Sequence, residues 1–479
     1  MDKKKKLTEL FISWSGETIN YFSNLLPSGS AREYYRITSN NNSAVGVFNT
    51  DKKENIAFIN FSKHFLSKGL KVPEIYNEDL DNNIYLIQDL GDETLFSIIS
   101  KVRKDENFPQ ELISYYKKVI EQLPLFQVKA GKDLDYSVCY PRSAFDEQSM
   151  MWDLNYFKYY FLKLARVQFD EQNLEDDFRR LCDFLLQADD EYFLYRDFQS
   201  RNIMIFKNEP YFIDYQGGRK GALQYDLASL LHDAKANIPQ QVREELLQHY
   251  IEVVNNILPV NEKEFIKYYY GFVLIRILQA MGAYGYRGFY ERKEHFLQSI
   301  PYALKNLKWI LENIYFPVRL KSLFTVLSQL IESKELKKYE KNKSTNTLTV
   351  TINSFSYFKG IPEDETGNGG GFVFDCRGIN NPGREEQFRL LTGKDKEVIE
   401  FLQTKSEVGK FLEDVYSLVD HSVNNYIERM FTNLVVNFGC TGGQHRSVYC
   451  AEQLAKHLKE KYNIKVIVNH KELNLTEEK

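Results

Sequence analysis

Three polar residues in the middle of the 479-residue chain have the types and the spacing that phosphoryl transfer requires. Asp197 and Asn202 lie in one predicted loop, and Asp214 follows a predicted hairpin over residues 203–213. Transfer of a phosphoryl group from a nucleotide needs a carboxylate that orients or deprotonates the acceptor hydroxyl, and oxygen ligands that hold Mg²⁺ against the phosphates. Asp197 fits the first task, and Asn202 with Asp214 fits the second.

Each of these residues alone is better explained by local structure, because Asp and Asn are common in turns and Asp often ends a strand. The three together, spaced in this way around one hairpin, favour a kinase site. The sequence therefore predicts one general base and two metal ligands in the same part of the chain.

A second candidate site lies near the carboxy end of the chain. A predicted buried strand over residues 433–438 is followed by a Gly-rich loop over residues 439–447, a helix over about 446–461 and another strand over 464–468. This order directs backbone N–H groups and a helix N-terminus at an anion, and Arg446 adds a bidentate partner for its oxygens. The loop is not a Walker A loop, since the Gly-Lys-Ser/Thr ending is missing.

The same loop has a second interpretation. Cys440 and Arg446 are separated by five residues and followed by Ser447, which is the C-x5-R-S/T spacing of cysteine phosphatases. In those enzymes a thiolate attacks phosphorus within a loop of amides. Short motif matches carry a real false-positive risk, so this phosphatase hypothesis stays an alternative.

The elements around the first site suggest two lobes. Strand candidates over residues 34–37, 44–48 and 84–87 surround a helix candidate over 54–68. The sequence pattern from about 110 to 335 is mostly helical, and residues 240–257 carry an apolar stripe at helical spacing. We expect a small lobe over about residues 1–95 and a helical lobe over about 96–335. A charged linker over 336–347 then precedes a separate domain over 348–479.

The composition excludes several classes of protein. Hydrophobic residues make up 43% and charged residues 27% of the chain, which rules out a wholly disordered protein. The net charge of −4 argues against bulk electrostatic coating of nucleic acid. Five scattered cysteines without a C-x-x-C pair argue against a disulfide framework or a structural zinc site. No apolar run is long enough for a signal peptide or a membrane span, so we expect a cytoplasmic protein without a membrane partner.

Residues 8–335 resemble the aminoglycoside phosphotransferase and choline kinase superfamily. The resemblance rests on Tyr195-Arg196-Asp197 through Asn202, which follows the H-x-D-x-x-x-x-N pattern with Tyr in place of His, and on Tyr225-Asp226-Leu227-Ala228. It implies a protein-kinase-like, two-lobed α+β fold followed here by a smaller α/β domain. It also implies Asp197 as the base, Asn202 and Asp214 as Mg²⁺ ligands, and Asp226 as a brace of the catalytic loop.

Two further segments are similar to the AmgK-type branch, whose members phosphorylate the anomeric hydroxyl of N-acetylmuramate and N-acetylglucosamine. They are the segment Leu26 to Ile37 and the hinge-like segment Leu86 to Asp92. The resemblance implies ATP as cofactor and an amino sugar as small-molecule substrate. Specificity would lie within residues 145–165, around Trp152, Asp153 and Tyr156, where the aromatic side chains either line the acceptor site or simply pack. Packing is the better explanation for each of them singly. The implied nucleotide-binding residues are Ser28, Gly29, Ser30, Arg32, Gln88 and Asp89.

One departure from the kinase pattern concerns the nucleotide site. Kinases of this fold carry a strand Lys that binds the α- and β-phosphates, yet the matching strand, Val45 to Asn49, contains none. Lys52, Lys53, Arg32 and Arg36 are the nearby cations that could replace it. A pseudokinase therefore stays an alternative to an active enzyme.

Residues 348–472 resemble the carboxy-terminal domain of RapZ, an adaptor that binds small RNA and senses glucosamine-6-phosphate. The matching stretches are Ser356 to Pro362, Phe374 to Gly378, Leu391 to Asp395 and Gly439 to Ser447. The resemblance implies a pocket for a phosphate or phosphosugar effector. Its implied residues are Thr441, Gly442, Gly443, His445 and Arg446, with Lys359, Asp375 and Arg377 as further candidates. Without a basic tail at the carboxy end, RNA is a doubtful partner.

The leading hypothesis is an ATP- and Mg²⁺-dependent amino-sugar kinase fused to a phosphosugar-binding or sensing domain. One alternative is a non-catalytic regulator that binds nucleotide or sugar phosphate together with RNA or protein. The other is the Cys440-dependent phosphatase in the carboxy-terminal domain.

Overall fold

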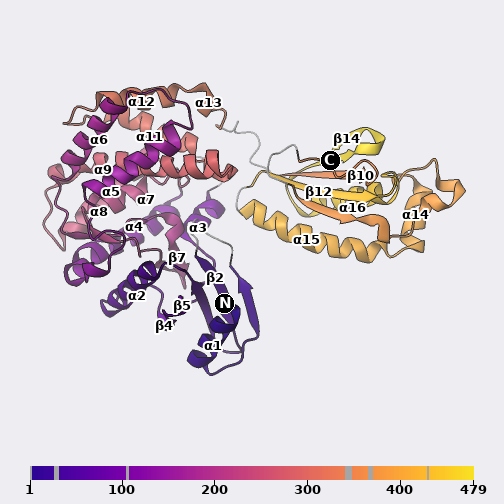
Figure 1. Ribbon diagram of the computed structural model, residues 1–479, viewed down its shortest axis with the longest axis horizontal. Helices are drawn as coiled ribbons and strands as arrows, with labels where there is room; N and C mark the ends of the chain where they lie inside the picture. The colour runs from indigo at the N-terminus through magenta and orange to yellow at the C-terminus, as the bar shows by residue number, and fades with distance from the viewer. Residues whose placement is uncertain (1–2, 26–31, 104–106, 340–347, 365–369, 429–430) are drawn as a thin grey trace. The chain divides into compact units, whose positions relative to one another are not determined.

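The computed structural model describes residues 3–25, 32–103, 107–339, 348–364, 370–428 and 431–479. The chain divides into two compact units, Met1–Glu340 and Lys341–Lys479 (Figure 1). Each unit has a hydrophobic core of its own.

The first unit begins with an antiparallel sheet in the order β1-β2-β3-β5-β4. Its strands are β1 (Tyr21–Asn24), β2 (Glu33–Thr38), β3 (Ser43–Phe48), β4 (Ile75–Asp79) and β5 (Ile84–Gln88). Alternation along the strands divides the side chains between two faces. One face packs against α1 (Lys3–Ser15), and the other packs against α2 (Lys52–Ser67). Gly46 of β3 permits the close approach of α1, because a Cβ there would lie 3.0 Å from the Leu7 side chain.

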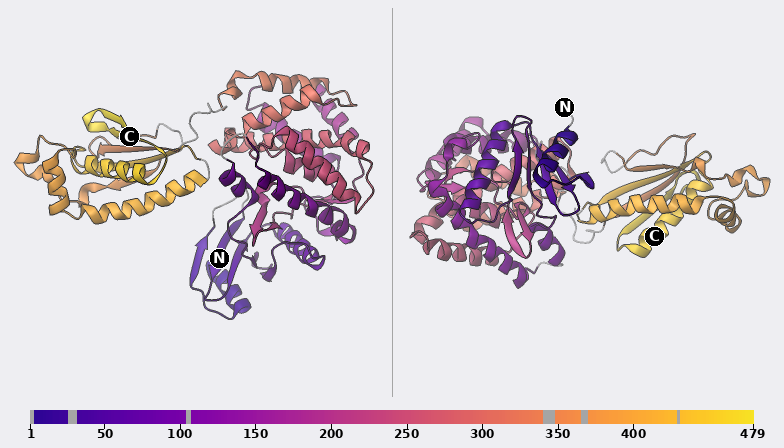
Figure 2. Two further views of the ribbon diagram at one scale, coloured as in Figure 1. Left: turned by 180° about the vertical axis from the view of Figure 1, so that it is seen from behind. Right: turned by 90° about the horizontal axis from the view of Figure 1, so that it is seen from below.

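The rest of the first unit is mainly helical (Figure 2). Its helices are α3 (Leu95–Val102), α4 (Gln110–Pro124), α5 (Glu147–Phe157), α6 (Glu171–Leu185), α7 (Gln224–Leu231), α8 (Gln240–Asn255), α9 (Glu262–Tyr284), α10 (Glu294–Leu297), α11 (Ile300–Asn313), α12 (Lys321–Glu332) and α13 (Lys334–Lys337). The long helix α9 packs against α5, α7 and α11. Because it is surrounded, it is apolar on nearly all sides rather than along one stripe.

Two short antiparallel pairs interrupt the helices and carry the predicted catalytic residues. β6 (Tyr192–Leu194) pairs with β9 (Arg219–Gly221), and β7 (Ile203–Phe206) pairs with β8 (Glu209–Phe212). The expected hairpin over residues 203–213 is confirmed. Strands at the three expected positions and helices close to 54–68 and 240–257 are confirmed as well.

The second unit is a five-stranded sheet in the order β11-β12-β10-β13-β14, parallel except for β14. Its strands are β10 (Thr349–Ser356), β11 (Phe372–Asp375), β12 (Asn433–Cys440), β13 (Lys465–His470) and β14 (Leu475–Glu478). Its helices are α14 (Lys396–Lys405), α15 (Val408–Glu428) and α16 (Arg446–Lys461). The predicted two-lobed α+β fold followed by a smaller α/β domain is therefore confirmed.

The predicted linker begins inside a helix. Leu336 belongs to α13 and is 2% exposed in the core of the first unit, and residues 340–347 lie outside the described part of the chain. Among the described residues, no helix combines the length and the apolar character needed to span a bilayer.

Candidate active site

The structure brings Asp197, Asn202 and Asp214 together. Asp197 lies in the loop after β6, Asn202 ends a single 3₁₀ turn (Ser200–Asn202), and Asp214 follows β8. The Asn202 side-chain amide donates hydrogen bonds to the Asp197 backbone carbonyl at 2.9 Å and to Asp214 Oδ2 at 3.1 Å. The side chains of Asp197 and Asp214 are 42% and 37% exposed, so both carboxylates remain accessible to a ligand.

The backbone on either side of this cluster adopts uncommon conformations. Asp214 has a φ of 70° and Arg196 has a φ of 82°, values that residues other than glycine rarely adopt. Such conformations persist where the surrounding contacts over-determine them. The cluster is therefore held in place by its neighbours rather than by local preference alone.

Asp226 supplies one of these contacts from α7. Its carboxylate accepts hydrogen bonds from the backbone N–H groups of Tyr195 at 2.8 Å and Arg196 at 3.0 Å, and from the Gln127 side chain at 3.1 Å. Burial raises the pKa of Asp226 to about 7, against the opposing effect of these hydrogen bonds. Asp226 thus fixes the two residues that precede Asp197.

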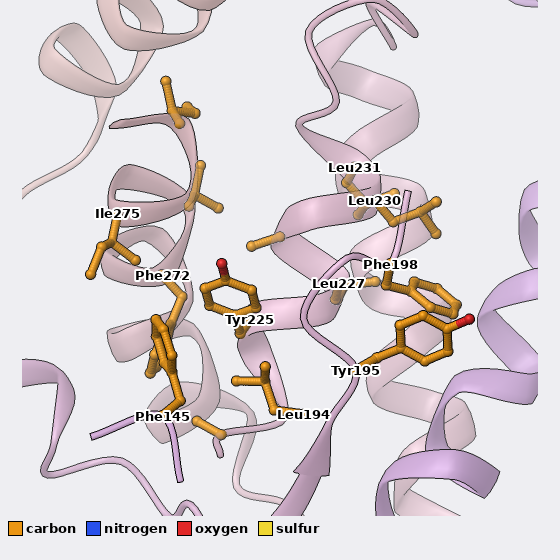
Figure 3. Close-up of a cluster of buried hydrophobic side chains, with 14 of the residues drawn as sticks. Phe145, Leu194, Tyr195, Phe198, Tyr225, Leu227, Leu230, Leu231, Phe272 and Ile275 are labelled. Atoms are coloured by element: carbon orange, nitrogen blue, oxygen red, sulfur yellow. The ribbon is translucent and has the colours of Figure 1, made fainter. Parts of the chain in front are cut away.

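Tyr195 stands where the kinase pattern has His. Its ring is buried among apolar side chains next to Phe198 (Figure 3), and its hydroxyl donates to the Ile213 backbone carbonyl at 2.6 Å. Since Ile213 directly precedes Asp214, this bond ties the loop of Asp197 to the strand end that carries Asp214. Tyr195 therefore supplies a side-chain link from this position.

Arg196 connects the loop to the predicted acceptor region. Its guanidinium donates to both Asp153 carboxylate oxygens, at 2.8 and 2.6 Å, and to the Tyr225 hydroxyl at 2.7 Å. Asp153, on α5, is only 9% exposed at its side chain and is occupied by Arg196. Trp152 is 47% exposed, and the Tyr156 ring packs against Tyr160.

Arg32 is the cation that reaches the site. It is 4% exposed, its Nη1 lies 3.3 Å from Asp214 Oδ1, and its Nη2 forms an ion pair with Glu54 in the first turn of α2. Burial and the neighbouring Asp197 raise the pKa of Asp214, whereas the charge of Arg32 opposes this shift.

The other three cations proposed to replace the strand Lys are occupied elsewhere. Lys52 pairs with Asp81 at 3.0 Å on the surface, and Lys53 lies 5.8 Å from the Tyr140 ring. Arg36 pairs with Asp89. Of the four candidates, Arg32 is the one whose described contacts include Asp214.

The remaining predicted nucleotide residues are only partly described. Ser28, Gly29 and Ser30 lie outside the described residues. Gln88 ends β5 and bonds through its backbone N–H to the Glu74 carbonyl at 2.9 Å. Asp89 accepts hydrogen bonds from the Ser43 hydroxyl at 2.7 Å and from Arg36 at 3.0 Å, and these lower its pKa against the effect of burial. Its carboxylate therefore holds the end of β5 to β2 and β3.

Sequence reasoning missed one charged neighbour of the base. Arg276 of α9 places Nη2 4.0 Å from Asp197 Oδ1. No local motif indicates this residue, because only the packing of α9 against α7 brings it to the loop.

In the second unit, Arg446 begins α16 and is 4% exposed. Its Nη1 donates to the backbone carbonyls of Arg377 and Ile379, at 3.0 Å each, and its Nη2 lies 3.5 Å from Thr441 Oγ1. Its Nε is buried without a hydrogen-bond partner among the described residues. A buried donor without a partner is costly, so this nitrogen favours an acceptor that a ligand could supply.

The carbonyls of the loop before α16 are bonded to other segments of the second unit. The carbonyls of Cys440, Thr441 and Gln444 accept hydrogen bonds from the Tyr357 amide, the Ser356 hydroxyl and the Gly393 amide. By contrast, no acceptor within the described residues bonds to the amide N–H of Gly442 or Gln444. Such a loop at a helix N-terminus suits an anion.

Cys440 lies beneath this loop. It is 3% exposed, and its Sγ accepts the Gly443 N–H at 3.2 Å and lies 3.2 Å from the Ser447 hydroxyl. The thiol therefore contacts both the loop and the first turn of α16.

The other predicted pocket residues each have a different contact. His445 contacts the Phe388 carbonyl through Nε2 at 2.9 Å. Asp375 and Arg377 pair with each other at 2.7 Å. Lys359 is 73% exposed at its side chain and pairs with Glu472 at 2.7 Å.

The described residues hold no group of three or more His, Cys, Asp or Glu side chains that could bind a metal. The predicted pair of Mg²⁺ ligands, one amide and one carboxylate, falls below that number. Two cavities of about 320 and 310 Å³ in the first unit are lined by other residues than those of either candidate site.

Family comparison matches both parts of the chain. Residues 25–259 match the phosphotransferase enzyme family, and residues 348–474 match the RapZ C-terminal domain. Together these matches cover the site of Asp197 and the loop of Arg446.

Curated relatives share only part of their length with this chain. A nucleotide-binding protein of Cupriavidus metallidurans is 36% identical over 156 residues, which are 33% of this chain and 49% of that protein. One of Nitrosomonas europaea is 40% identical over 132 residues, 28% of this chain and 43% of that protein. The chain thus spans about half, or less, of the length of these relatives.

Solved structures give distant matches. The choline kinase LicA from Streptococcus pneumoniae has a TM-score of 0.44 at 16% identity, covering 65% of this chain and 100% of that one. The ADP-bound aminoglycoside phosphotransferase APH(2'')-Ib has a TM-score of 0.44 at 12% identity, covering 71% of this chain and 99% of that one.

Proposed function

We propose that this chain, which joins a domain of the phosphotransferase enzyme family to a RapZ C-terminal domain, is an ATP-dependent kinase of a small hydroxyl-bearing molecule. The observation that carries the proposal is the convergence of Asp197, Asn202 and Asp214 around the β7–β8 hairpin, with Asn202 bonded to both partners.

In this proposal Asp197 accepts the proton of the acceptor hydroxyl. Its carboxylate is exposed, whereas its backbone is held by Asn202 and the loop before it is held by Asp226. A fixed backbone beneath an accessible carboxylate suits a general base, which must reach the reacting hydroxyl in one orientation.

Asn202 and Asp214 would hold Mg²⁺. Because the Asn202 NH₂ group donates to Asp197 and Asp214, its carbonyl oxygen is left for a cation. Burial, together with the neighbouring carboxylates of Asp197 and Glu54, raises the pKa of Asp214, and a bound cation would offset these effects. When bound, Mg²⁺ neutralises the charge on the transferring phosphate oxygens.

Arg32 would replace the missing strand Lys as the cation of the nucleotide site. Glu54 orients its guanidinium from α2, and Asp214 lies on its other side. Arg32 therefore brings positive charge to the metal-binding carboxylate and links it to the first turn of α2.

The finer proposal concerns the acceptor, for which we propose an amino sugar of the N-acetylmuramate or N-acetylglucosamine type, phosphorylated at the anomeric hydroxyl. It is supported by the AmgK-like segments of the sequence and by the aromatic side chains of α5 and its neighbours, where the Tyr160 ring contacts Tyr156 and Tyr286.

The test is ATP turnover by the purified chain, with Mg²⁺, over a panel of amino sugars, with Asp197→Asn as the control. We expect turnover with one sugar and a loss of roughly 10²- to 10⁴-fold in kcat for the variant. Absence of turnover with every sugar, together with absence of Mg-ATP binding by the folded protein, would instead support the non-catalytic regulator.

For the second unit we propose binding of a phosphosugar at the loop of Arg446. It is supported by the Gly442 and Gln444 amides, which have no acceptor among the described residues, and by the buried Nε. Calorimetric titration with glucosamine-6-phosphate tests it. We expect saturable binding that Arg446→Gln abolishes, and unchanged binding in this variant would contradict the assignment.

A cysteine phosphatase is the second candidate, because the Gly443 amide and the Ser447 hydroxyl both approach Cys440 Sγ. Hydrolysis of p-nitrophenyl phosphate that disappears in Cys440→Ser would support it. Hydrolysis that is absent, or equal in the variant, would reject it.

A further inference from the structure

Arg276 is the buried cation beside the proposed base. It lies on α9, is 7% exposed, and is held at two of its three nitrogens. Nε donates to the Ser229 hydroxyl of α7 at 2.9 Å, and Nη1 donates to Gln279 one turn further along α9. A guanidinium fixed in this way keeps one orientation, so its third nitrogen points in a defined direction.

That third nitrogen, Nη2, faces Asp197. It lies 4.0 Å from Asp197 Oδ1, which is too long for a hydrogen bond. Within the described part of the chain, Nη2 donates to no acceptor, and it is not one of the buried polar atoms left without a partner. It therefore lies beside the carboxylate that the acceptor hydroxyl must approach, without a hydrogen-bond acceptor among the described residues.

The other carboxylates around the loop have partners other than Arg276. Asp153 is paired with Nη1 and Nη2 of Arg196. Asp233 accepts the Ser200 hydroxyl at 2.8 Å, and Asp226 accepts the Tyr195 and Arg196 amides. Within the described part of the chain, the carboxylate that forms an ion pair with Arg276 is Asp197, the proposed base.

A cationic acceptor would meet Arg276 next to the base, and like charges repel at this range. A carboxylate on the acceptor could instead receive charge-assisted hydrogen bonds from Nη2, and a planar guanidinium is well shaped for a carboxylate. Resting on the proposed kinase function, we propose that Arg276 is a specificity-determining residue that binds an anionic group of the acceptor and disfavours cationic acceptors.

The test uses three sugars that share one ring and differ in charge: glucosamine, N-acetylglucosamine and N-acetylmuramate, which carries a lactyl carboxylate. Steady-state kcat/KM is measured for the full chain and for Arg276→Gln and Arg276→Lys. For the wild type we expect N-acetylmuramate to be preferred over N-acetylglucosamine by roughly 10- to 100-fold, as for a hydrogen bond to a charged group, with glucosamine the poorest.

In Arg276→Gln, kcat/KM for N-acetylmuramate should fall to about the value for N-acetylglucosamine. The fall should come mainly from a higher KM, as expected when ground-state binding is lost. Arg276→Lys should restore part of the preference for N-acetylmuramate. Arg179→Gln, which removes a surface Arg of α6 that is 50% exposed, is the matched control and should change none of the three values.

Two results would overturn the inference while leaving the kinase in place. One is an equal loss of kcat with all three sugars in Arg276→Gln, which would show that Arg276 acts on the base. The other is a wild type that uses the neutral sugar as well as the acid. Absence of turnover by the wild type with all three sugars, although it binds Mg-ATP, would reject the acceptor class and this inference together.

Discussion

At the scale of single residues, the candidate site pairs exposed reactive groups with buried supports. Asp197 is accessible, while Tyr195, Asp226 and Arg32 beneath and beside it are almost completely buried. A buried ion pair contributes little net stability, but removing one partner leaves an uncompensated charge. The supports should therefore be sensitive both in folding and in activity.

The first prediction concerns Arg32. Arg32→Met leaves Glu54 and Asp214 without their shared cation. Because both carboxylates are about a third exposed, we expect a loss of only about 1 kcal/mol in the free energy of unfolding. We also expect a higher KM for ATP, because the positive charge beside Asp214 is gone. Arg32→Lys should recover part of both, as measured by urea unfolding and steady-state kinetics. A Met variant with wild-type KM for ATP would contradict the proposed role.

The second prediction is a pH dependence from Asp226. Its pKa of about 7 in the folded chain lies above its ordinary value of 3.8. The folded state therefore holds the proton more tightly, and this contribution is complete below pH 3.8 and is lost as the pH rises to about 7. A shift of this size corresponds to no more than about 4 kcal/mol.

The measurement compares the urea midpoint of the first unit at pH 5 and pH 8 in the wild type and in Asp226→Asn, which does not titrate. We expect the wild type to lose more stability than the variant between these two pH values. We also expect Asp226→Asn to be less stable throughout, because an amide cannot accept from all three N–H groups that face the carboxylate. Parallel pH profiles would contradict the raised pKa.

At the scale of elements, the wall of the proposed acceptor region depends on how closely α9 approaches α5. A Cβ on Gly282 would lie 2.6 Å from Tyr156 Cδ1 and 2.9 Å from the Phe157 backbone nitrogen. At these distances the two helices would have to move apart. The aromatic cluster of Tyr156, Tyr160 and Tyr286 lies on the same two elements and their extensions.

The third prediction is that Gly282→Ala raises the KM for the acceptor sugar while leaving the KM for ATP nearly unchanged. Overpacking typically costs about 1 to 3 kcal/mol, so the melting temperature of the first unit should fall by several degrees. Calorimetry and kinetics check the two parts. Gly409→Ala is the matched control, because a Cβ there would meet no neighbour within 4 Å.

At the scale of the whole molecule, the two units have separate cores that share no buried residue. Structures of this kind unfold in more than one step. Two calorimetric transitions are therefore the fourth prediction. Glucosamine-6-phosphate should raise the transition temperature of the second unit only. At a hundredfold excess over its Kd, it should add about 2.7 kcal/mol to the free energy of unfolding of this unit, and Arg446→Gln should remove this effect. A single transition would show that the units unfold together.

The fusion also raises the question of whether a sugar phosphate bound in the second unit alters the kinase. Such an effect requires the ligand to bind two states of the kinase unequally. Titration of glucosamine-6-phosphate into the turnover assay tests this. Unchanged turnover at saturating binding would mean that the two units act independently.

Much of the candidate site was predictable from residues close together in the chain. Asp197, Asn202 and Asp214 surround one hairpin, and turn formation and strand pairing at that range depend on neighbouring residues. The β-α-β order around Arg446 was predictable for the same reason, since strand and helix periodicity are local properties. The two-lobed fold was predicted from the resemblance of residues 8–335 to a known superfamily.

Long-range partners were not predictable in this way. Sequence reasoning did not predict that Asp89 pairs with Arg36 or that Asp153 pairs with Arg196. It left four cations as replacements for the strand Lys, and packing brings only Arg32 of these to Asp214 among the described contacts. Arg276 carried no motif at all. A charge's partner depends on which helices and strands pack together, and that packing is set by the burial of the whole core rather than by the residues beside the charge.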